Sequence, residues 1–406
     1  MSALKYWLWL TCLTGLKNQS RLLLLRHFGT PEAVYYAEEA EFPLVEGLER
    51  QQASLLSDRT LEKAERVLER CQVLGLDIVT LQDANYPERL RNIYDPPCLL
   101  YVKGHLPPLD EEIVISAVGT RKCTPYGVNC AERLCYGLAT GGAIVASGLA
   151  RGIDSAAIRG ALLGGGATIG VLGNGLDVVY PRENQNLYED VSAAGALISE
   201  YPPGTEPLPG HFPIRNRILS GIAVGALVVE APLYSGALIT ASRALEQGRD
   251  VFAVPGPIGS YTSQGCNRLI RDGASLVADA SDILEAYAAR FPDKLKQSRE
   301  IPVVLPQDTS DAQDVSDAPP VPDVPEERPA PPVVSVADGT ISPEQAQLLR
   351  LMDIETPIHV DDLTDLSGLS TRQVLSNLTL LEIDGYIQQH AGKRYTRLVD
   401  VAGGDA

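Results

Sequence analysis

Residues 143–172 read AIVASGLARGIDSAAIRGALLGGGATIGVL, and this stretch decides the fold. Residues 143–147 and 168–172 are short apolar runs typical of strands that are buried on both faces, and residues 154–163 between them have the spacing of a helix. Buried strands that are separated by single helices form parallel sheets. The stretch therefore predicts one strand–helix–strand unit of a parallel α/β sheet.

The same alternation extends over residues 76–291. Further strands are predicted at Ile113–Val118, Ala196–Ser199, Ala226–Glu230, Asp250–Val254 and Ser275–Val277. Helical patterns fall between them at Asn129–Leu138, Gln185–Ala193, Asn216–Ile222, Thr240–Gln247, Cys266–Arg271 and Ser281–Ala289. The fold class predicted for this core is α/β, a Rossmann-like, doubly wound parallel sheet with helices on both faces.

Residues 1–75 read as short helices and predict a small module of the SAM or helix-hairpin-helix kind. The apolar run Trp7–Leu16 lies between lysines, but no small-residue cleavage site follows it. It is also shorter than the ~20 residues that span a bilayer. We therefore expect a core helix here, no membrane contact, and a cytoplasmic protein.

Residues 292–340 predict a disordered linker. Residues 301–340 contain nine prolines, and eight acidic residues against one arginine. Such a segment cannot bury enough apolar surface to offset the entropy lost on ordering. It also carries much of the net charge of −18, so the rest of the 406-residue chain is only mildly acidic. Any nucleic-acid binding must then come from a few placed arginines rather than a broadly basic surface.

Residues 341–400 predict a winged-helix domain. Three helices are expected at Ser342–Met352, Val360–Ser367 and Thr371–Asp384, with Ser370-Thr371 as the cap of the third. A hairpin at Ile387–Arg397 with its turn at Gly392 would be the wing. The wing is basic at Lys393, Arg394 and Arg397, but the segment holds nine acidic residues against five basic ones. Duplex DNA and another protein both remain open as its partner.

Glycines and arginines follow the predicted strands, at the edge of a parallel sheet where ligands bind. Glycine lets the backbone approach a ligand closely, helix N-termini present free N–H groups, and arginine binds phosphate in a bidentate manner. The candidate residues are Gly119, Thr120 and Arg121 after the first strand, Ser147, Gly148 and Arg151 after the second, Arg182 after the third, Phe212, Arg215, Asn216 and Arg217 after the fourth, and Ser235 and Gly236 after the fifth.

Each of these residues alone has a plainer explanation. A glycine loop is often only a tight turn, a single arginine is often a solvated surface residue, and Phe212 could be a core residue. Asp154 could simply cap its helix. Their shared position at one rim of the sheet favours a binding site for an anionic ligand.

Enzyme motifs do not fit this chain. Gly119 to Gly127 does not give G-x-G-x-x-G, and neither a P-loop nor a Ser/His/Asp signature is present. Of the core histidines, only His211 follows a strand. The seven cysteines show neither CxxC spacing nor a Cys/His cluster, which predicts free thiols. We expect no catalytic residue, no metal and no cofactor.

Several motifs of the core resemble the DprA/Smf family, in consistent order over residues 80–285. They are YPERL at Tyr86–Leu90, PPCLLYVKG at Pro96–Gly104, VGTRKCTPYG at Val118–Gly127, SGLARGIDSAAIRGAL at Ser147–Leu162, GALISE at Gly195–Glu200, FPIRNRILSG at Phe212–Gly221, SGALITASRALEQGR at Ser235–Arg249 and VFAVPG at Val251–Gly256. Two positions depart from the family pattern, because Ile158 replaces its usual His and Thr120 its usual Ser.

The resemblance implies a non-enzymatic DNA-processing protein of natural transformation (competence) and recombination. Such proteins bind and protect single-stranded DNA, load the recombinase RecA, and act as homodimers. The family's pocket residues transfer to Gly119, Thr120, Arg121, Arg182, Phe212, Arg215 and Asn216, together with the turns at Ser147-Gly148 and Ser235-Gly236. Arginines would hold phosphates and Phe212 would stack on a base.

An enzyme is the alternative interpretation. Nucleotide phosphoribohydrolases of the lysine-decarboxylase-like class share a Rossmann-like core and carry P-G-G-x-G-T-x-x-E with a catalytic Glu. The equivalent stretch Ser235–Arg243 lacks that Glu, so the sequence favours binding over hydrolysis.

Overall fold

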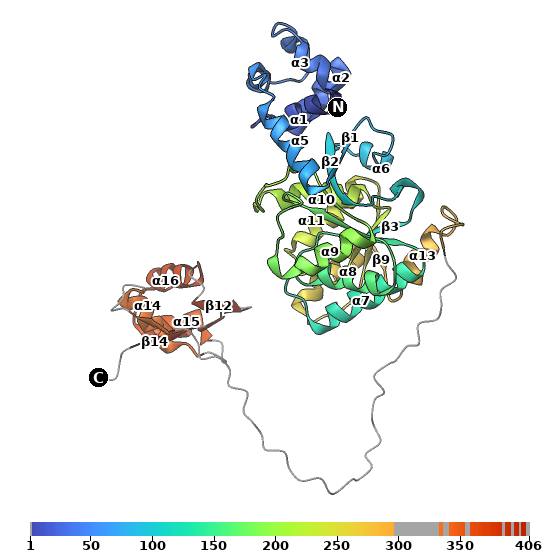
Figure 1. The fold of residues 1–406 in the computed structure, drawn as a ribbon. Coiled ribbons are helices and arrows are strands. Elements are labelled where there is room, and N and C mark those ends of the chain that lie inside the picture. The colour runs from blue at the N-terminus through green and yellow to red at the C-terminus, as the bar shows by residue number, and fades with distance from the viewer. Residues whose placement is uncertain are drawn as a thin grey trace. The chain divides into compact units, whose positions relative to one another are not determined.

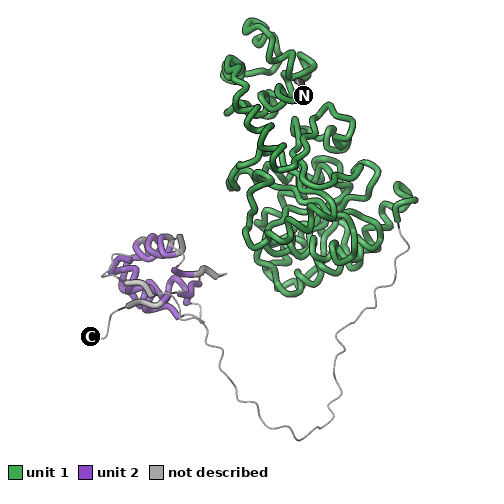
Figure 2. Tube along the Cα trace, in the orientation of Figure 1, with its two compact units in different colours: residues 1–306 green, residues 307–406 purple. Residues whose placement is uncertain are grey.

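The computed structural model describes residues 2–295, 333–335, 341–353, 358–383, 386–390, 394–397 and 399–402. The chain divides into two compact units, Met1–Pro306 and Gln307–Ala406 (Figure 2). Most of the linker predicted at 292–340 lies outside the described residues. The boundaries predicted at residues 75 and 291 stay predictions, since the helical segment and the sheet belong to one unit.

A nine-stranded sheet forms the centre of the first unit. Its strands, in spatial order, are β1 (Asp77–Thr80), β2 (Leu99–Gly104), β6 (Ala196–Ser199), β5 (Thr168–Leu172), β4 (Ile144–Ser147), β3 (Val114–Val118), β7 (Gly225–Val228), β8 (Asp250–Ala253) and β9 (Ser275–Leu276). Strands β3 to β9 are parallel, as predicted. Strands β1 and β2 extend the sheet in antiparallel fashion. They escaped the strand–helix pattern because only the four-residue α6 (Glu88–Arg91) lies between them.

Helices cover both faces of this sheet, which confirms the doubly wound architecture (Figure 1). One core lies under α7 (Pro125–Thr140), α8 (Ile153–Leu163), α9 (Gln185–Ala194) and α13 (Ser281–Tyr287). The other lies under α6, α10 (His211–Gly221), α11 (Gly236–Glu246) and α12 (Gln264–Arg271). Along β3 the side chains alternate between the cores, because Ile115 and Ala117 belong to the first and Val114 and Val118 to the second.

Five short helices precede the sheet, as predicted. They are α1 (Ser2–Cys12), α2 (Asn18–Phe28), α3 (Pro31–Tyr36), α4 (Arg50–Ser54) and α5 (Glu62–Leu74). Helix α1 is a core helix, since Trp7, Leu8, Trp9 and Leu10 are all buried. These helices share the first core of the sheet. Within the described part of the chain, no helix combines the length and apolarity that crossing a bilayer requires.

The second unit has the predicted winged-helix elements. Its helices are α14 (Pro343–Leu351), α15 (Val360–Ser367) and α16 (Thr371–Ile383). The wing pairs β12 (Ile387–His390) with β13 (Arg394–Arg397) in antiparallel fashion, and β11 (Ile358–His359) adds to β13. Ser370 caps α16, because the Gln373 amide donates to its hydroxyl at 3.4 Å. A separate parallel pair joins β10 (Val333–Ser335) to β14 (Asp400–Ala402). The expected wing residues Gly392 and Lys393 lie outside the described residues.

The strand order fixes where a ligand can bind. Strand β3 lies between β4 and β7. The chain builds outward from β3 through β4, β5 and β6, then returns to the other side of β3 with β7. Such a reversal opens a crevice at the carboxyl ends of the two strands, because the loops after them turn to opposite faces of the sheet. A ligand-binding site is therefore expected in the crevice at the carboxyl ends of β3 and β7.

Helices α7 and α8 approach so closely at Gly160 that no side chain fits between them. A methyl group there would lie 2.2 Å from the Glu132 carbonyl oxygen. We expect Gly160→Ala to destabilise the first unit by at least about 1 kcal/mol, because the cost of overpacking exceeds the gain in helix propensity. Urea denaturation measures this. Gly259→Ala is the control, since a methyl there meets nothing within 4 Å. Equal stability of the two variants would contradict the packing.

Candidate nucleic-acid interface

A pocket of about 540 Å³ lies at the carboxyl ends of β3 and β7, at the switch point. Its wall comes from the loops after β3, β4, β5, β6 and β7 and from the helices α10 and α11. Most of the residues predicted from the sequence line it: Gly119, Thr120, Arg121, Phe212, Arg215, Asn216, Ser235 and Gly236. Asp154, Tyr180 and Tyr234 also belong to the wall.

Two aromatic rings and one guanidinium group form one side of the pocket. The Arg121 guanidinium carbon lies 5.4 Å from the centre of the Phe212 ring. The Tyr180 ring lies 5.7 Å from the same ring at an interplanar angle of 36°. Arg121 is exposed, and within the described residues it has no carboxylate partner. This arrangement offers a stacking surface beside a free cation, and the sequence analysis did not single out Tyr180 for it.

A buried guanidinium forms the floor of the pocket. Arg215 is only 4% exposed and donates from Nη1 to the Val171 carbonyl. It fits because residue 148 is glycine, where a methyl group would lie 2.4 Å from both terminal nitrogens of Arg215. Its Nε has no hydrogen-bond partner among the described atoms. The positive charge of Arg215 is thus held beneath the pocket.

Asp154 is the acidic group with the largest electrostatic effect on this charge. Burial raises the pKa of the Asp154 carboxyl, while the Arg215 charge and the backbone around Ala150 and Gly119 act in the opposite direction. Burial lowers the pKa of Arg215, and Asp154 opposes that change. No ion pair within 4 Å joins the two side chains among the described residues. Arg215 therefore keeps part of its field available to a ligand in the pocket.

Glu230 fixes the loop that carries Gly119, Thr120 and Arg121. Its carbonyl accepts from the Thr120 amide at 2.7 Å. Its buried carboxylate accepts from the amide of Thr124 at 2.9 Å and from the hydroxyl of Thr124 at 2.8 Å. From the sequence, Glu230 was predicted only as the end of a strand. An acid that closes an otherwise apolar buried strand was the available signal.

The turn after β4 is held in a strained conformation. Leu149 is buried and has a φ of 52°, a left-handed value that is rare for a bulky residue. The Asn184 side-chain amide donates to the Leu149 carbonyl at 2.9 Å. The Ser155 hydroxyl donates to the next carbonyl, that of Ala150, at 2.6 Å. Such strain persists where the surroundings fix it, and it is common beside functional sites.

The start of α11 completes the pocket. Ser235 caps the helix by accepting from the Ala237 amide at 3.3 Å. Gly236 follows with an open environment, because a methyl group there would meet nothing within 4 Å. The first amides of a helix carry partial positive charge and attract anions. This end of α11 adds to the positive field of Arg121 and Arg215.

Five predicted site residues do not line the pocket. Ser147 is buried and its hydroxyl donates to the Ala117 carbonyl at 2.7 Å, which ties β4 to β3. Gly148 lies under Arg215. Arg151 forms a bidentate ion pair with Glu183 at 2.7 Å. Arg182 is exposed two residues beyond Tyr180, with no carboxylate partner in the described part of the chain. It is therefore free to contact a ligand that extends beyond the pocket.

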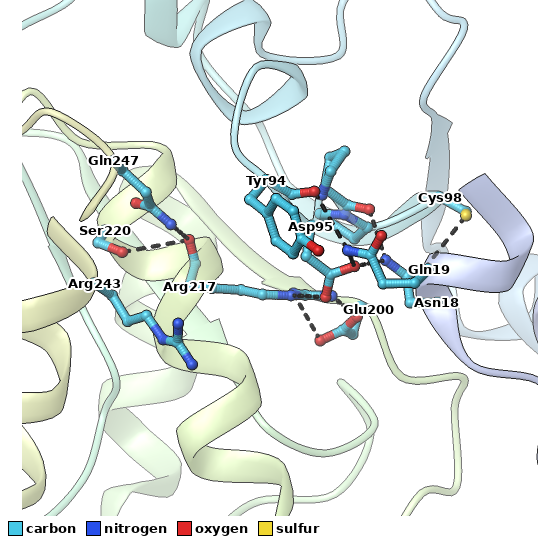
Figure 3. A network of polar contacts seen from close by, with 12 residues as sticks. Asn18, Gln19, Tyr94, Asp95, Cys98, Glu200, Arg217, Ser220, Arg243 and Gln247 are labelled. Atoms are coloured by element: carbon cyan, nitrogen blue, oxygen red, sulfur yellow. Dashed lines mark hydrogen bonds and ion pairs between the residues drawn. The ribbon is translucent and has the colours of Figure 1, made fainter. Parts of the chain in front are cut away.

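Arg217 is the fifth predicted site residue that does not line the pocket, and its predicted role as a ligand-binding residue needs correction. Figure 3 shows its side chain pointing into a polar network with Asp95 and Glu200, and Arg217 is not among the residues that line the pocket. Its Nε donates to Asp95 at 3.0 Å, and its Nη2 donates to Glu200 at 2.7 Å. Asp95 also accepts from Asn18 and Gln19 on α2. Arg217 thus joins α10 to the N-terminal helices, and its charge is already neutralised.

Removing Arg217 should cost stability. Its side chain is 9% exposed and that of Glu200 is 14% exposed, so Arg217→Ala leaves a nearly buried carboxylate without its partner. We expect a loss of about 3–5 kcal/mol in urea denaturation. Arg133→Ala is the control, because its pair with Asp279 is about half exposed on both sides, and a loss below about 1 kcal/mol is expected. Similar values for both variants would show that the network is not structural.

The sequence and the fold match known proteins. Residues 77–288 match the family model of DNA recombination-mediator protein A, and residues 324–393 match that of the DprA winged helix domain. The chain is 33% identical over 396 residues to protein Smf of Synechocystis, which covers 97% of this chain and 98% of that protein. It is 46% identical over 208 residues to DNA processing protein DprA of Streptococcus pneumoniae, which covers 51% of this chain and 73% of that protein.

A solved structure agrees with these matches. The X-ray structure of DNA processing protein A from Streptococcus pneumoniae superposes with a TM-score of 0.62 and a sequence identity of 37%. The superposition covers 69% of this chain and 97% of that chain. The likeness therefore extends over almost the whole length of the solved structure.

Proposed function

Because the chain belongs to the DNA recombination-mediator protein A family, to which DNA processing protein DprA and protein Smf are related, we propose that its pocket binds an unpaired DNA strand without regard to sequence. The observation that carries the proposal is the position of Arg121 over Phe212 beside Tyr180. Stacking surfaces next to free cations are what single-strand binding proteins use, since every base has a π-face.

The phosphates of the strand would meet several positive groups. Arg121 and Arg182 are exposed and unpaired within the described residues, Arg215 lies beneath the pocket, and the N-terminus of α11, which carries the positive end of its dipole, lines the pocket. The Asn216 side chain lines the pocket and has no hydrogen-bond partner among the described residues, so its amide is available to a phosphate or a base. Most of these contacts would be with the phosphate backbone of the DNA. We therefore expect the binding affinity to fall steeply as the salt concentration rises.

A single strand fits this pocket better than a duplex does. Phe212 is partly buried and lines a concave space. A base must leave its stack and its partner to reach the ring, which costs little in an unpaired strand and more in a duplex. We therefore expect preference for single-stranded over double-stranded DNA.

The family resemblance supports a wider proposal for the whole chain. We propose that the chain protects bound single strands and loads RecA onto them, and that it acts as a homodimer. Two linked pockets raise affinity through effective concentration, which matters because one pocket of about 540 Å³ holds few nucleotides. The winged helix would contact duplex DNA or a protein partner, and both remain open.

The alternative function, nucleotide phosphoribohydrolysis, finds little support in the pocket. That reaction needs a carboxylate at the start of α11, and Ser235–Arg243 has none. Among the described residues that line the pocket, Asp154 is the only acid, and it is buried next to Arg215. Incubation with nucleoside monophosphates, followed by an assay for free base, tests this function directly.

Arg121→Ala should weaken single-strand binding by at least about tenfold, since a charge-assisted contact contributes about 1.5–3 kcal/mol. Fluorescence anisotropy with labelled oligo-dT across a salt series measures the loss, and the slope of log K against log salt should fall by about 0.7. Arg133→Ala removes the same charge outside the pocket and should leave affinity unchanged. Unchanged affinity in a natively folded Arg121→Ala would refute the proposed function.

The stacking role of Phe212 has its own test. Phe212→Leu keeps an apolar side chain but removes the ring, and it should reduce the binding free energy by about 1–3 kcal/mol. Phe212→Trp should retain most of the affinity, because indole also stacks. The same anisotropy assay applies. Equal affinities of the Leu variant and the wild type would mean that the ring packs against Gly173 and does not contact a base.

A further inference from the structure

A second hollow lies between helix α5 and the core, within the first unit. It has a volume of about 520 Å³ and is lined by Lys63, Arg66, Val67 and Arg70 from α5 and by Asp177, Pro203 and Gly204 from the core. We call it the α5 groove. Figure 1 shows α5 descending toward the sheet from the N-terminal helices. Its cations belong to a part of the chain that the pocket does not use.

The helix sorts its charges onto two faces. Lys63, Arg66 and Arg70 are spaced three and four residues apart, so they share the face that lines the groove. The acidic residues Glu62, Glu65 and Glu69 are each one position earlier, and they lie about 100° around the helix. No ion pair within the described residues joins the two sets. In a chain with a net charge of −18, this separation leaves a locally positive groove.

Two of the three cations are available to an anion. The Arg66 Nε donates to the Glu62 carbonyl, and its guanidinium has no carboxylate partner among the described residues. The Lys63 ammonium donates to the Cys12 carbonyl at 2.9 Å and to the Thr14 hydroxyl at 3.3 Å, which leaves its third N–H for an anion, and it has no carboxylate partner among the described residues. Arg70 differs, since it pairs with Asp177 at 3.1 Å.

The Arg70–Asp177 pair has a structural role. Asp177 also accepts from the Gly204 amide at 2.7 Å. It therefore fixes α5 and the loop after β6 to the same carboxylate, and the groove has walls that are held in place. The cations of Lys63 and Arg66 are thus presented from a defined position.

One loop connects the α5 groove to the pocket. Pro203 and Gly204 line the groove, and Pro207 and Pro209 line the pocket. Gly204 and Pro207 are three residues apart, so at most about 11 Å of chain separates these two walls. A strand that leaves the pocket needs only a few more nucleotides to reach the groove.

We propose that the α5 groove is a second phosphate-binding segment for the strand held in the pocket, with Lys63 and Arg66 as its ligands. The N-terminal helices thereby lengthen the single-strand track rather than only supporting the sheet. The proposal rests on the proposed function of the pocket. The groove would contact the phosphate backbone of the DNA and would make no base-specific contact.

The test compares oligo-dT of two lengths, roughly 6 and roughly 20 nucleotides, within and above the span that single-strand binding modules cover. In the full-length chain, the double variant Lys63→Gln/Arg66→Gln should bind the long oligonucleotide several-fold more weakly. Its salt slope should fall by about 1.4, which is about 0.7 for each lost phosphate contact. Binding of the short oligonucleotide should stay at the wild-type value. The control Arg26→Gln/Arg50→Gln removes equal charge from exposed positions on two other N-terminal helices, α2 and α4, and should match the wild type at both lengths.

Other results would overturn the inference. Wild-type binding of both lengths by the double variant would show that the groove carries no DNA. Equal weakening for both lengths, or weakening in the control, would show a general charge effect. Loss of duplex binding alone would assign the groove to a different ligand. Failure of the proposed function looks different, because the wild-type chain would then bind neither oligonucleotide, or Arg121→Ala would bind both normally.

Discussion

The site depends on one constraint, which is that a guanidinium must be buried beneath a pocket without being neutralised. Arg215 meets it through three neighbours. Gly148 leaves room for the planar group, and the Val171 carbonyl accepts one of its N–H groups. Asp154 supplies a counter-charge that is not in direct ion-pair contact. A closer carboxylate would cancel the field, and none at all would make burial too costly. The strained turn at Leu149 fits this need, because it brings Gly148 directly under the arginine.

A protein with a net negative charge can bind a polyanion if some of its arginines have no carboxylate partner. On this chain several arginines are neutralised, such as Arg151 by Glu183 and Arg217 by Glu200. Arg121 and Arg215 at the pocket are not paired in this way. For the proposed DNA ligand, steering by the whole-protein field would therefore be weak, and short-range contacts would carry the attraction. Net charge alone would have argued against DNA, whereas the pairing of individual residues argues for it.

The sequence predicted the fold well because each strand–helix unit is a local pattern. The runs around residues 113–118, 143–147 and 168–172 became parallel strands, and the residues after them reached one crevice. The prediction of site residues failed where it depended on the direction in which a side chain points from its helix. Arg215 and Arg217 are two residues apart on α10, about 200° around the helix, so only one can face the pocket. A stacking role for Tyr180 was not predicted, because its contact with Phe212 exists only in three dimensions.

The correction at Arg217 also explains how the pocket relates to the helices before the sheet. Helix α10 presents Arg215 and Asn216 to the pocket on one side and Arg217 to Asp95 and Glu200 on the other. Asp95 in turn accepts from α2, so the N-terminal helices are fixed to the helix that forms the pocket floor. The Arg70–Asp177 pair fixes α5 in a similar way to the loop that leads into α10. Two buried or partly buried ion pairs therefore give these helices a fixed position relative to the pocket, and a fixed position is what a continuous binding surface requires.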